Sequence, residues 1–250
     1  MAAPVIVMAV ATIMTAGCSS GGGLAEHPSS HSTASSQPQP TTSKAAAIPN
    51  GPQLGKMLAA AHLPKGWEIA PGGDSIGTSS SMLMAGDGPT PAEYTCKYLD
   101  SGASAGYPIS WWSSSDASAV LEYPTTAANL PQVTLNVGAY APGNAAKTMA
   151  KLAALQARCR SFRDPSVDNF PTTTSVKTIP HLGDQNLFLT SRERTNNAGT
   201  LVGQMFLVRD GNYIVAVDTN TGLDGDVRPA TVQGFGAWLL QQLQQANYLS

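Results

Sequence analysis

The sequence has little charge. Charged residues make up 12% of the 250 residues, about half of the roughly 25% that is usual in soluble domains. The 14 Lys and Arg and the 16 Asp and Glu give a formal net charge of −2. A protein that binds phosphate backbones needs a strongly basic face. The composition therefore argues against a nucleic-acid partner.

Aromatic residues and long apolar runs are also scarce. Aromatic residues are 6% of the chain, against 24 glycines and 18 prolines, so part of the chain is expected to be unfolded linker. The body of the chain lacks an apolar run of about 18 residues, which excludes a protein with several membrane-spanning helices. The sequence has no CxxC pair, Walker loop, GxGxxG or HExxH motif. We expect neither a cofactor nor a bound metal.

The N-terminus reads as an export signal. The apolar stretch 5–14 has the length of a signal-peptide core and is too short to span a bilayer. Two small residues and Cys18 follow, and this arrangement resembles the lipobox of bacterial lipoproteins, although Thr15 stands where Leu is usual and no Lys or Arg precedes the core. We expect 1–17 to be a lipoprotein signal peptide and Cys18 to be lipidated. The alternative is an ordinary cleaved signal.

A low-complexity segment follows the signal. Residues 18–47 consist mainly of Ser, Thr, Gly, Pro, Gln and Ala and contain no aromatic residue. Such a segment cannot bury enough apolar area to offset its ordering entropy, so it is expected to be a flexible tether to a domain at 48–250. His27 and His31 are four residues apart, but Pro28 between them argues against a helix and hence against a metal site.

The cysteine count supports lipidation. Three cysteines is an odd number for an exported chain. If Cys18 carries lipid, Cys96 and Cys159 remain and can pair in an oxidising compartment. The bond would close a loop of about 63 residues and contribute up to about 4 kcal/mol in the chain-entropy model. The alternative is two buried free thiols.

Hydrophobic periodicity predicts the secondary structure. Helices are expected at 51–62, 89–99, 144–162 and 229–247. Strands are expected at 79–85, 109–123, 132–140, 172–179, 186–194, 201–209 and 212–218. Consecutive strands with short connections imply an antiparallel sheet. The predicted fold class is α+β, with an antiparallel β-sheet packed with α-helices in a single domain.

Two local patterns are especially clear. In 144–162, one apolar stripe is formed by Met149, Leu152, Leu155, Cys159 and Phe162. Asn144 can cap this helix, and a Cys96–Cys159 bond would pin it to the helix that carries Cys96. Asp210 and Gly211 predict a tight hairpin, because Asp-Gly readily adopts positive φ angles.

One segment resembles a hydrolase motif. Residues 73–77 have the spacing G-x-S-x-G, which in hydrolases puts a serine nucleophile on a sharp turn. A triad with Ser75 would need Asp164 or Asp168 and then His181. The flanking residues do not predict the required strand–turn–helix. We therefore expect a plain loop there and expect that the chain is not an enzyme.

Two further polar segments read as loops. His181 and Asp184 could be a base and its partner, but their position between two strands favours a turn in which Asp184 bonds backbone amides. Residues 218–226 are rich in oxygen ligands, yet Leu223 and Pro229 occupy the sixth and twelfth positions, which a helix-loop-helix calcium site fills with Gly and Glu. A solvated loop is expected, with a looser calcium site as the alternative.

Three residues are candidates for ligand binding. Trp111 and Trp112 are adjacent, and neighbours on a strand face opposite sides, so one would fill the core while Trp112 lines a groove. Arg192 and Arg194 share one strand face, with Glu193 opposite. The two arginines could bind an anion, although paired surface charges usually only solvate a sheet edge.

A family resemblance rests on the order of several motifs. They are Leu63-Pro64-Lys65-Gly66-Trp67, a helix at Cys96, Trp112 before an Ala/Val-rich strand, Cys159-Arg160-Ser161-Phe162, Leu182-Gly183-Asp184 and Val208-Arg209-Asp210-Gly211-Asn212-Tyr213-Ile214-Val215. Over about 50–248 the chain resembles the extracellular sensor domain of PknH-type actinobacterial Ser/Thr kinases and the lipoproteins that carry this domain without a kinase.

The resemblance implies a non-catalytic extracytoplasmic domain with a cleft for an unidentified ligand, and it supplies no catalytic residues. It also implies disulfide pairing, with two bonds in the kinase example, whereas only Cys96 and Cys159 are available here. Because no kinase domain is present, any signalling would need a partner.

These observations lead to one expectation with two alternatives. We expect a lipoprotein on the extracytoplasmic face of the cell membrane whose domain binds a small molecule or a cell-envelope component. The first alternative is an interaction module that docks on another envelope protein, and the second is a secreted hydrolase that uses Ser75 and His181.

Overall fold

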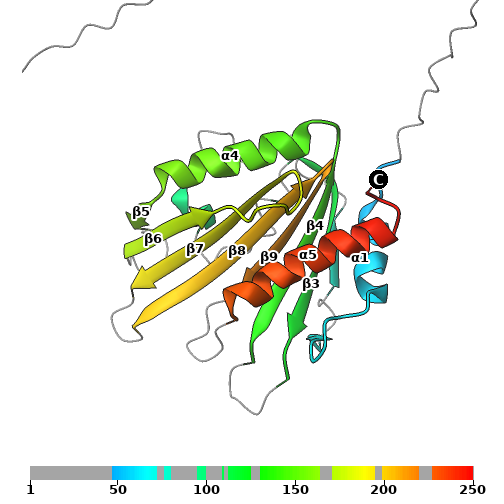
Figure 1. Ribbon diagram of the computed structural model, residues 1–250, viewed down its shortest axis with the longest axis horizontal. Coiled ribbons are helices and arrows are strands. Elements are labelled where there is room, and N and C mark those ends of the chain that lie inside the picture. The colour runs from blue at the N-terminus through cyan, green and yellow to red at the C-terminus, as the bar shows by residue number, and fades with distance from the viewer. Residues whose placement is uncertain are drawn as a thin grey trace, which may run out of the picture. The chain divides into compact units, whose positions relative to one another are not determined.

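The computed structural model describes residues 47–71, 76–79, 95–99, 109, 112–124, 130–163, 171–194, 199–219 and 227–249. All of them belong to the unit Ala45–Ser250. Figure 1 shows an open sheet with helices packed against it.

The described residues form a sheet of nine strands. The strands are β1 (Glu68–Ile69), β2 (Ile76–Ser79), β3 (Ser113–Glu122), β4 (Gln132–Tyr140), β5 (Ser161–Arg163), β6 (Pro171–Lys177), β7 (Gln185–Arg194), β8 (Thr200–Asp210) and β9 (Tyr213–Thr219). Their order is β1-β3-β4-β9-β8-β7-β6-β5, and β2 also pairs with β3. Every pairing is antiparallel. The predicted α+β fold is confirmed.

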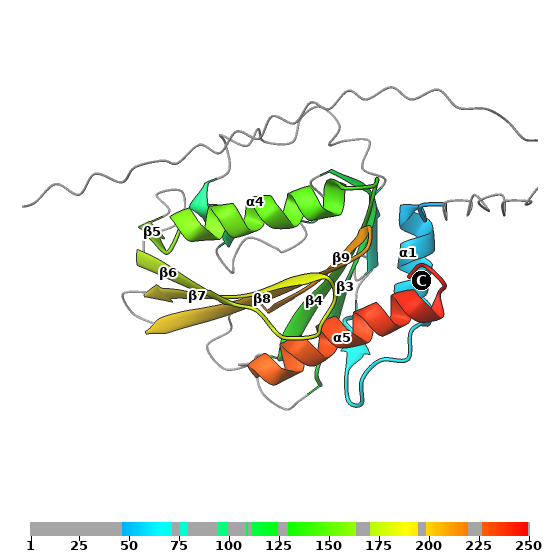
Figure 2. The same ribbon diagram turned by 45° about the horizontal axis from the view of Figure 1, so that its top comes forward.

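Helices cover both faces of this sheet. They are α1 (Gly51–Ala60), α4 (Asn144–Arg158) and α5 (Pro229–Gln245), with a short 3-10 turn, η2 (Cys96–Leu99). Figure 2 shows α4 on one side of the sheet and α5 on the other. The strands therefore contribute to two hydrophobic clusters, one beneath α1 and α5 and one beneath α4. The middle strand β9 is buried along its whole length, because it lies between both layers.

Residues at the ends of α1 and α5 stabilise these helices. In α1 the Asn50 side chain accepts from the Gln53 amide, and the Gln53 side chain accepts from the Asn50 amide, so a capping box satisfies two otherwise unpaired donors. Pro229 begins α5, where its missing N–H costs nothing. Asn247, with φ of 59°, ends the chain's last helical turn.

The predicted helix 144–162 differs from α4 at both ends. It ends at Arg158, and Phe162 lies in β5, because β5 pairs with β6 and thereby redirects the chain. Asn144 is the first helical residue instead of the cap, which is Gly143 with φ of 83°. The stripe of apolar residues nevertheless faces the sheet as predicted, and Cys159 is 1% exposed.

Other differences concern the segment before β3. The predicted strand 109–123 begins only at Ser113, because Trp112 has φ of 58° and therefore lies in a turn. Of the predicted helix 89–99, only 95–99 is described, and Cys96–Leu99 forms the 3-10 turn. Of the predicted strand 79–85, only Ser79 is described, at the end of β2. Ile109, the first residue of the predicted strand 109–123, is helical, and the other residues of 79–85 and 89–99 lie outside the described residues.

The structure contains both the predicted disulfide and the predicted hairpin. Cys96 and Cys159 form a disulfide with Cα atoms 5.4 Å apart, which joins η2 to the end of α4. The hairpin between β8 and β9 turns at Gly211, with φ of 55°, next to the paired residues Asp210 and Tyr213. No described helix is both long and apolar enough to span a membrane.

Candidate functional site

Arg192 and Arg194 lie near the end of β7, on the part of the strand face that α5 does not cover. Both side chains are exposed and alternate with buried Ser191 and half-buried Glu193. They share their face with Phe188, which belongs to the cluster beneath α1 and α5. Figure 1 shows α5 crossing the sheet beside β8 and β9, so that β6 and β7 extend beyond it. Exposure therefore rises along β7 from Phe188 to Arg194.

Strand β6 adds a third cation and two hydroxyl side chains to this face. Lys177 pairs with Phe188, Ser175 with Thr190, and Thr173 with Arg192. Directly opposed residues share a face of the sheet, and these three β6 side chains are all exposed. We call Thr173, Ser175, Lys177, Thr190, Arg192 and Arg194 the cationic face.

The positive charge of the cationic face is uncompensated within the described part of the chain. Neither β6 nor β7 places an acidic side chain on it, because Glu193 points to the opposite side. Neither Arg192 nor Arg194 has a described ion-pair partner, in contrast to Arg209, which lies 2.9 Å from Asp184. The Lys177 Nζ atom lies 4.8 Å from the Phe188 ring centroid. An anion could approach these groups without displacing a carboxylate of the described residues.

A buried amide lies beside the cationic face. Gln204 in β8 pairs with Thr190 and is 7% exposed. Its Nε2 donates to the Val227 carbonyl at 2.7 Å, while its Oε1 is buried without a hydrogen-bond partner. An amide in an otherwise apolar run was the signal that sequence reasoning missed. Lys177 joins the arginines only through the pairing of β6 with β7, which alternation within a single strand does not reveal.

Trp112 does not join this site. It packs against the cluster beneath α4, on the other side of the sheet, and the Lys151 Nζ atom lies 4.0 Å from its ring centroid. Trp112 lies in a turn and not in the strand, so the expectation that Trp111 and Trp112 face opposite sides does not apply. Trp111 lies outside the described residues. The structure therefore brings Arg192 and Arg194 together and leaves Trp112 apart.

The segment at His181 and Asp184 is a turn. The Asp184 carboxylate accepts from the Gly211 amide at 3.0 Å and pairs with Arg209, and its own amide donates to the Arg209 carbonyl at 2.8 Å. His181 is exposed, with φ of 61°. These bonds tie the turn before β7 to the β8–β9 hairpin. Burial raises the pKa of Asp210, the charge of Asp184 adds to this rise, and Arg209 opposes it.

The other sequence candidates lie wholly or mostly outside the described residues. They are Cys18, His27, His31, Ser75, Asp164, Asp168 and the segment 220–226. Asp218, which begins the predicted oxygen-rich loop, is a buried residue of β9 with 1% exposure. No group of three potential metal ligands occurs among the described residues.

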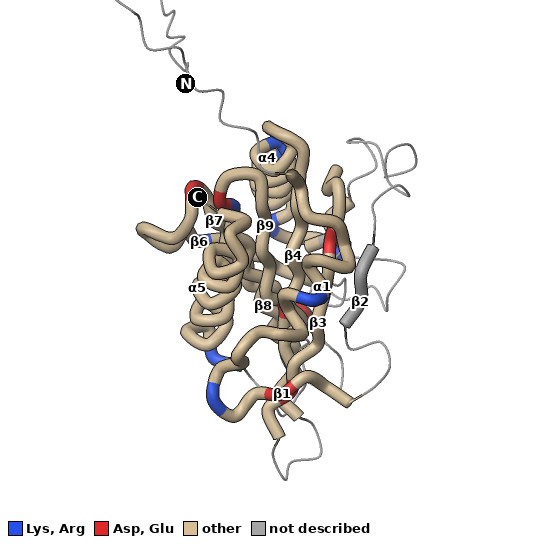
Figure 3. Tube along the Cα trace, turned by 90° about the vertical axis from the view of Figure 1, so that its right-hand side faces the viewer, with Lys and Arg blue, Asp and Glu red and all other residues tan. Residues whose placement is uncertain are grey.

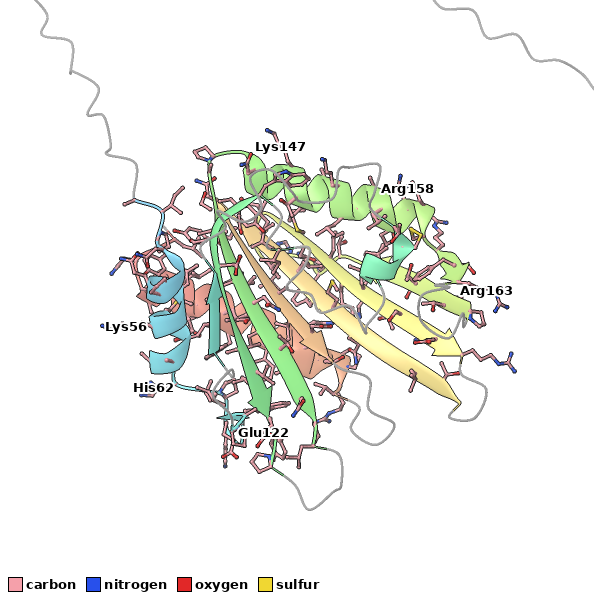
Figure 4. All side chains as sticks on the ribbon, turned by 180° about the vertical axis from the view of Figure 1, so that it is seen from behind. Lys56, His62, Glu122, Lys147, Arg158 and Arg163 are labelled. Carbon is pink, nitrogen blue, oxygen red and sulfur yellow. A yellow bond between two sulfur atoms is a disulfide. The ribbon has the colours of Figure 1, made fainter. Side chains whose placement is uncertain are left out.

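Figure 3 views the side of the molecule that carries α1 and α5, where α5 holds no charged residue. A hollow of about 330 Å³ lies between α1 and the end of α5 and is lined by Gln53, Lys56, Met57, Gln242 and Tyr248, among others. Lys56 is the one charged group in it, and Figure 4 shows this side chain on the outer side of α1. The charge that would select an anion lies on the cationic face instead.

Comparison with known proteins gives a structural likeness but no family. No protein-family model matches the chain, and no curated protein matches it. Among solved structures, the chain is similar to the extracellular domain of PknH from Mycobacterium tuberculosis, with 12% identity and a TM-score of 0.41, over 79% of this chain and 93% of that one. A likeness at this level carries no argument about ligand or activity.

Proposed function

We propose that the protein is an exported lipoprotein, anchored through Cys18 to the cell membrane, whose extracytoplasmic domain binds an anionic component of the cell envelope without chemical conversion. The N-terminal sequence supports export and lipidation. The disulfide between Cys96 and Cys159 supports an oxidising compartment. The cationic face supports an anionic ligand.

The observation that carries the binding proposal is the pair Arg192 and Arg194, exposed on one open strand face without a described ion-pair partner. A guanidinium group presents a rigid fork of donors that matches carboxylate and phosphate oxygens. Two such groups at i and i+2 on a strand point the same way. An anion that contacts both gains two charge-assisted hydrogen-bonded pairs.

Both alternatives have less support. An interaction module would need a contiguous apolar patch. The exposed large hydrophobic residues among those described are Ile48 before α1, Tyr123 after β3 and Val176 in β6, three separate places along the chain. For a hydrolase, His181 lies in the turn before β7, and no described contact orients it as a base.

The lipidation half of the proposal is tested on the membrane-extracted protein. The expected mature chain begins at Cys18 and carries the mass of a lipid group, while replacement of Cys18 by Ser yields a chain without that mass. Intact mass spectrometry measures both. A soluble mature chain that begins elsewhere would contradict anchoring at this residue.

The binding half is tested with heparin as a defined polyanion. Replacing Arg192 and Arg194 by Gln is expected to weaken binding about 30-fold at fixed salt, since each cation near an anionic surface contributes about 1 kcal/mol. Fluorescence anisotropy with labelled heparin measures the affinity. The matched control replaces Lys56 and Lys65, two exposed cations elsewhere on the domain, and is expected to change it little. A larger loss of heparin affinity in the control variant would show that the anion binds elsewhere than at β7.

A further inference from the structure

The positive charges of the cationic face are arranged along a line. Lys177 stands beside Phe188, and Arg192 and Arg194 follow on β7. With a rise of about 3.3 Å per residue, Arg192 lies about 13 Å and Arg194 about 20 Å along the strand from the position of Lys177. A single phosphate or carboxylate cannot reach both ends of this strip.

The space between the charges is lined by hydroxyl groups. Ser175 and Thr190 form the pair between the Lys177 and Arg192 positions, and Thr173 lies beside Arg192. Hydroxyl side chains both donate and accept hydrogen bonds. A ligand that lies across them gains most when it also carries hydroxyl groups between its charges.

On β6 and β7 the cationic face also offers little exposed apolar area. Phe188 is 2% exposed, so its ring is not available for stacking on a ligand. Recognition on this surface must therefore come from charge and hydrogen bonds. This combination disfavours an apolar helix or a lipid tail and suits an extended polar chain.

From this arrangement we infer that the ligand is a linear, hydroxyl-bearing polyanion, an acidic glycan segment that lies along β7 with anionic groups at both ends of the strip. Arg192 and Arg194 hold one anionic group, Lys177 meets another, and Ser175 and Thr190 bond the hydroxyls between them. The inference rests on the proposed function and adds the length and the chemical class of the ligand.

Length is tested with oligogalacturonates and the purified full-length protein. The dimer is too short to span the strip, whereas the octamer spans it. Replacing Lys177 by Gln is expected to weaken octamer binding about fivefold and to leave dimer binding unchanged, while replacing both arginines weakens both. Calorimetric titration measures each affinity. An equal effect of Lys177→Gln on dimer and octamer would overturn the extended ligand.

Chemical class is tested with octaglutamate, which has the charges of the octamer but no hydroxyl groups, and with phosphatidylglycerol vesicles. Octagalacturonate is expected to bind about three- to tenfold more tightly than octaglutamate, and Thr190→Val removes part of that difference. Equal affinities for the two oligomers, or tighter binding to the vesicles, would reject the glycan while heparin binding still supported an anion site. If heparin does not bind at all, the proposed function itself fails.

Discussion

Replacing Cys96 and Cys159 together by Ala is expected to lower the free energy of unfolding by about 4 kcal/mol. The two cysteines are 63 residues apart, and a cross-link over a loop of this length removes much of the conformational freedom of the unfolded chain. For a domain of this size the change corresponds to a melting temperature lower by about 8–16 °C.

The position of the bond adds to its importance. Cys159 lies at the end of α4, where its carbonyl accepts a hydrogen bond from the Thr174 hydroxyl of β6. Cys96 lies on η2. The bond therefore fastens η2 to the place where the helix joins the sheet. Denaturant unfolding of the double variant measures the loss.

Adding a reductant distinguishes the stabilising effect of the cross-link from the effect of replacing the two side chains. It should destabilise the natural protein by nearly the same amount as the double substitution and should leave the variant unchanged. Unfolding midpoints that do not differ between oxidised and reduced natural protein would contradict the stabilising role of this bond.

Replacing Gly236 by Ala is expected to destabilise the domain by about 1–2 kcal/mol, although Ala is the better helix former by about 1 kcal/mol. A Cβ atom at Gly236 would lie 2.6 Å and 2.7 Å from two ring atoms of Phe206 in β8. Phe206 is fully buried, so its ring has no free space to enter. The close approach of α5 to the sheet, visible in Figure 2, depends on this glycine.

Gly234 provides the matched control on the same helix. Nothing lies within 4 Å of a Cβ atom built there, so Gly234→Ala is expected to stabilise the domain by up to about 1 kcal/mol. Chemical denaturation of both variants compares two chemically identical changes two residues apart. If both variants were stabilised equally, α5 would not contact β8 as described.

The long strands with clear alternation could be predicted closely because alternation is a local property, whereas the short strands β1 and β5 were not predicted. The predicted strand 132–140 coincides with β4, and the predicted 186–194 differs from β7 by one residue. Apolar side chains every second residue leave few other conformations that bury them. The same alternation predicts that Arg192 and Arg194 share a face.

The errors occurred where a distant part of the chain decides the local conformation. The apolar stripe of 144–162 continues past Arg158, but β5 pairs with β6, and this pairing ends the helix before Phe162. Trp112 looks like a strand residue, yet it adopts a positive φ and packs on the α4 side. Neither outcome has a signal within a few residues of the position concerned.

The candidate site, too, could be predicted from the sequence only in part. Sequence alone placed the two arginines together, but it could not show that Lys177 stands on the same face. That knowledge needs the pairing of β6 with β7. It also needs the position of α5, which covers Phe188 and Phe206 and leaves the rest of β7 open.

What the amino-acid sequence determined by itself is the antiparallel α+β class, most of the long helices and strands, and the residues that alternate toward each face. These follow from periods of 2 and 3.6 residues, which short segments express without help from the rest of the chain. Only the tertiary structure decided which strand faces stay uncovered and where α4 stops. Those features depend on how far-apart segments pack, because burial of one apolar surface by another is set by the whole fold.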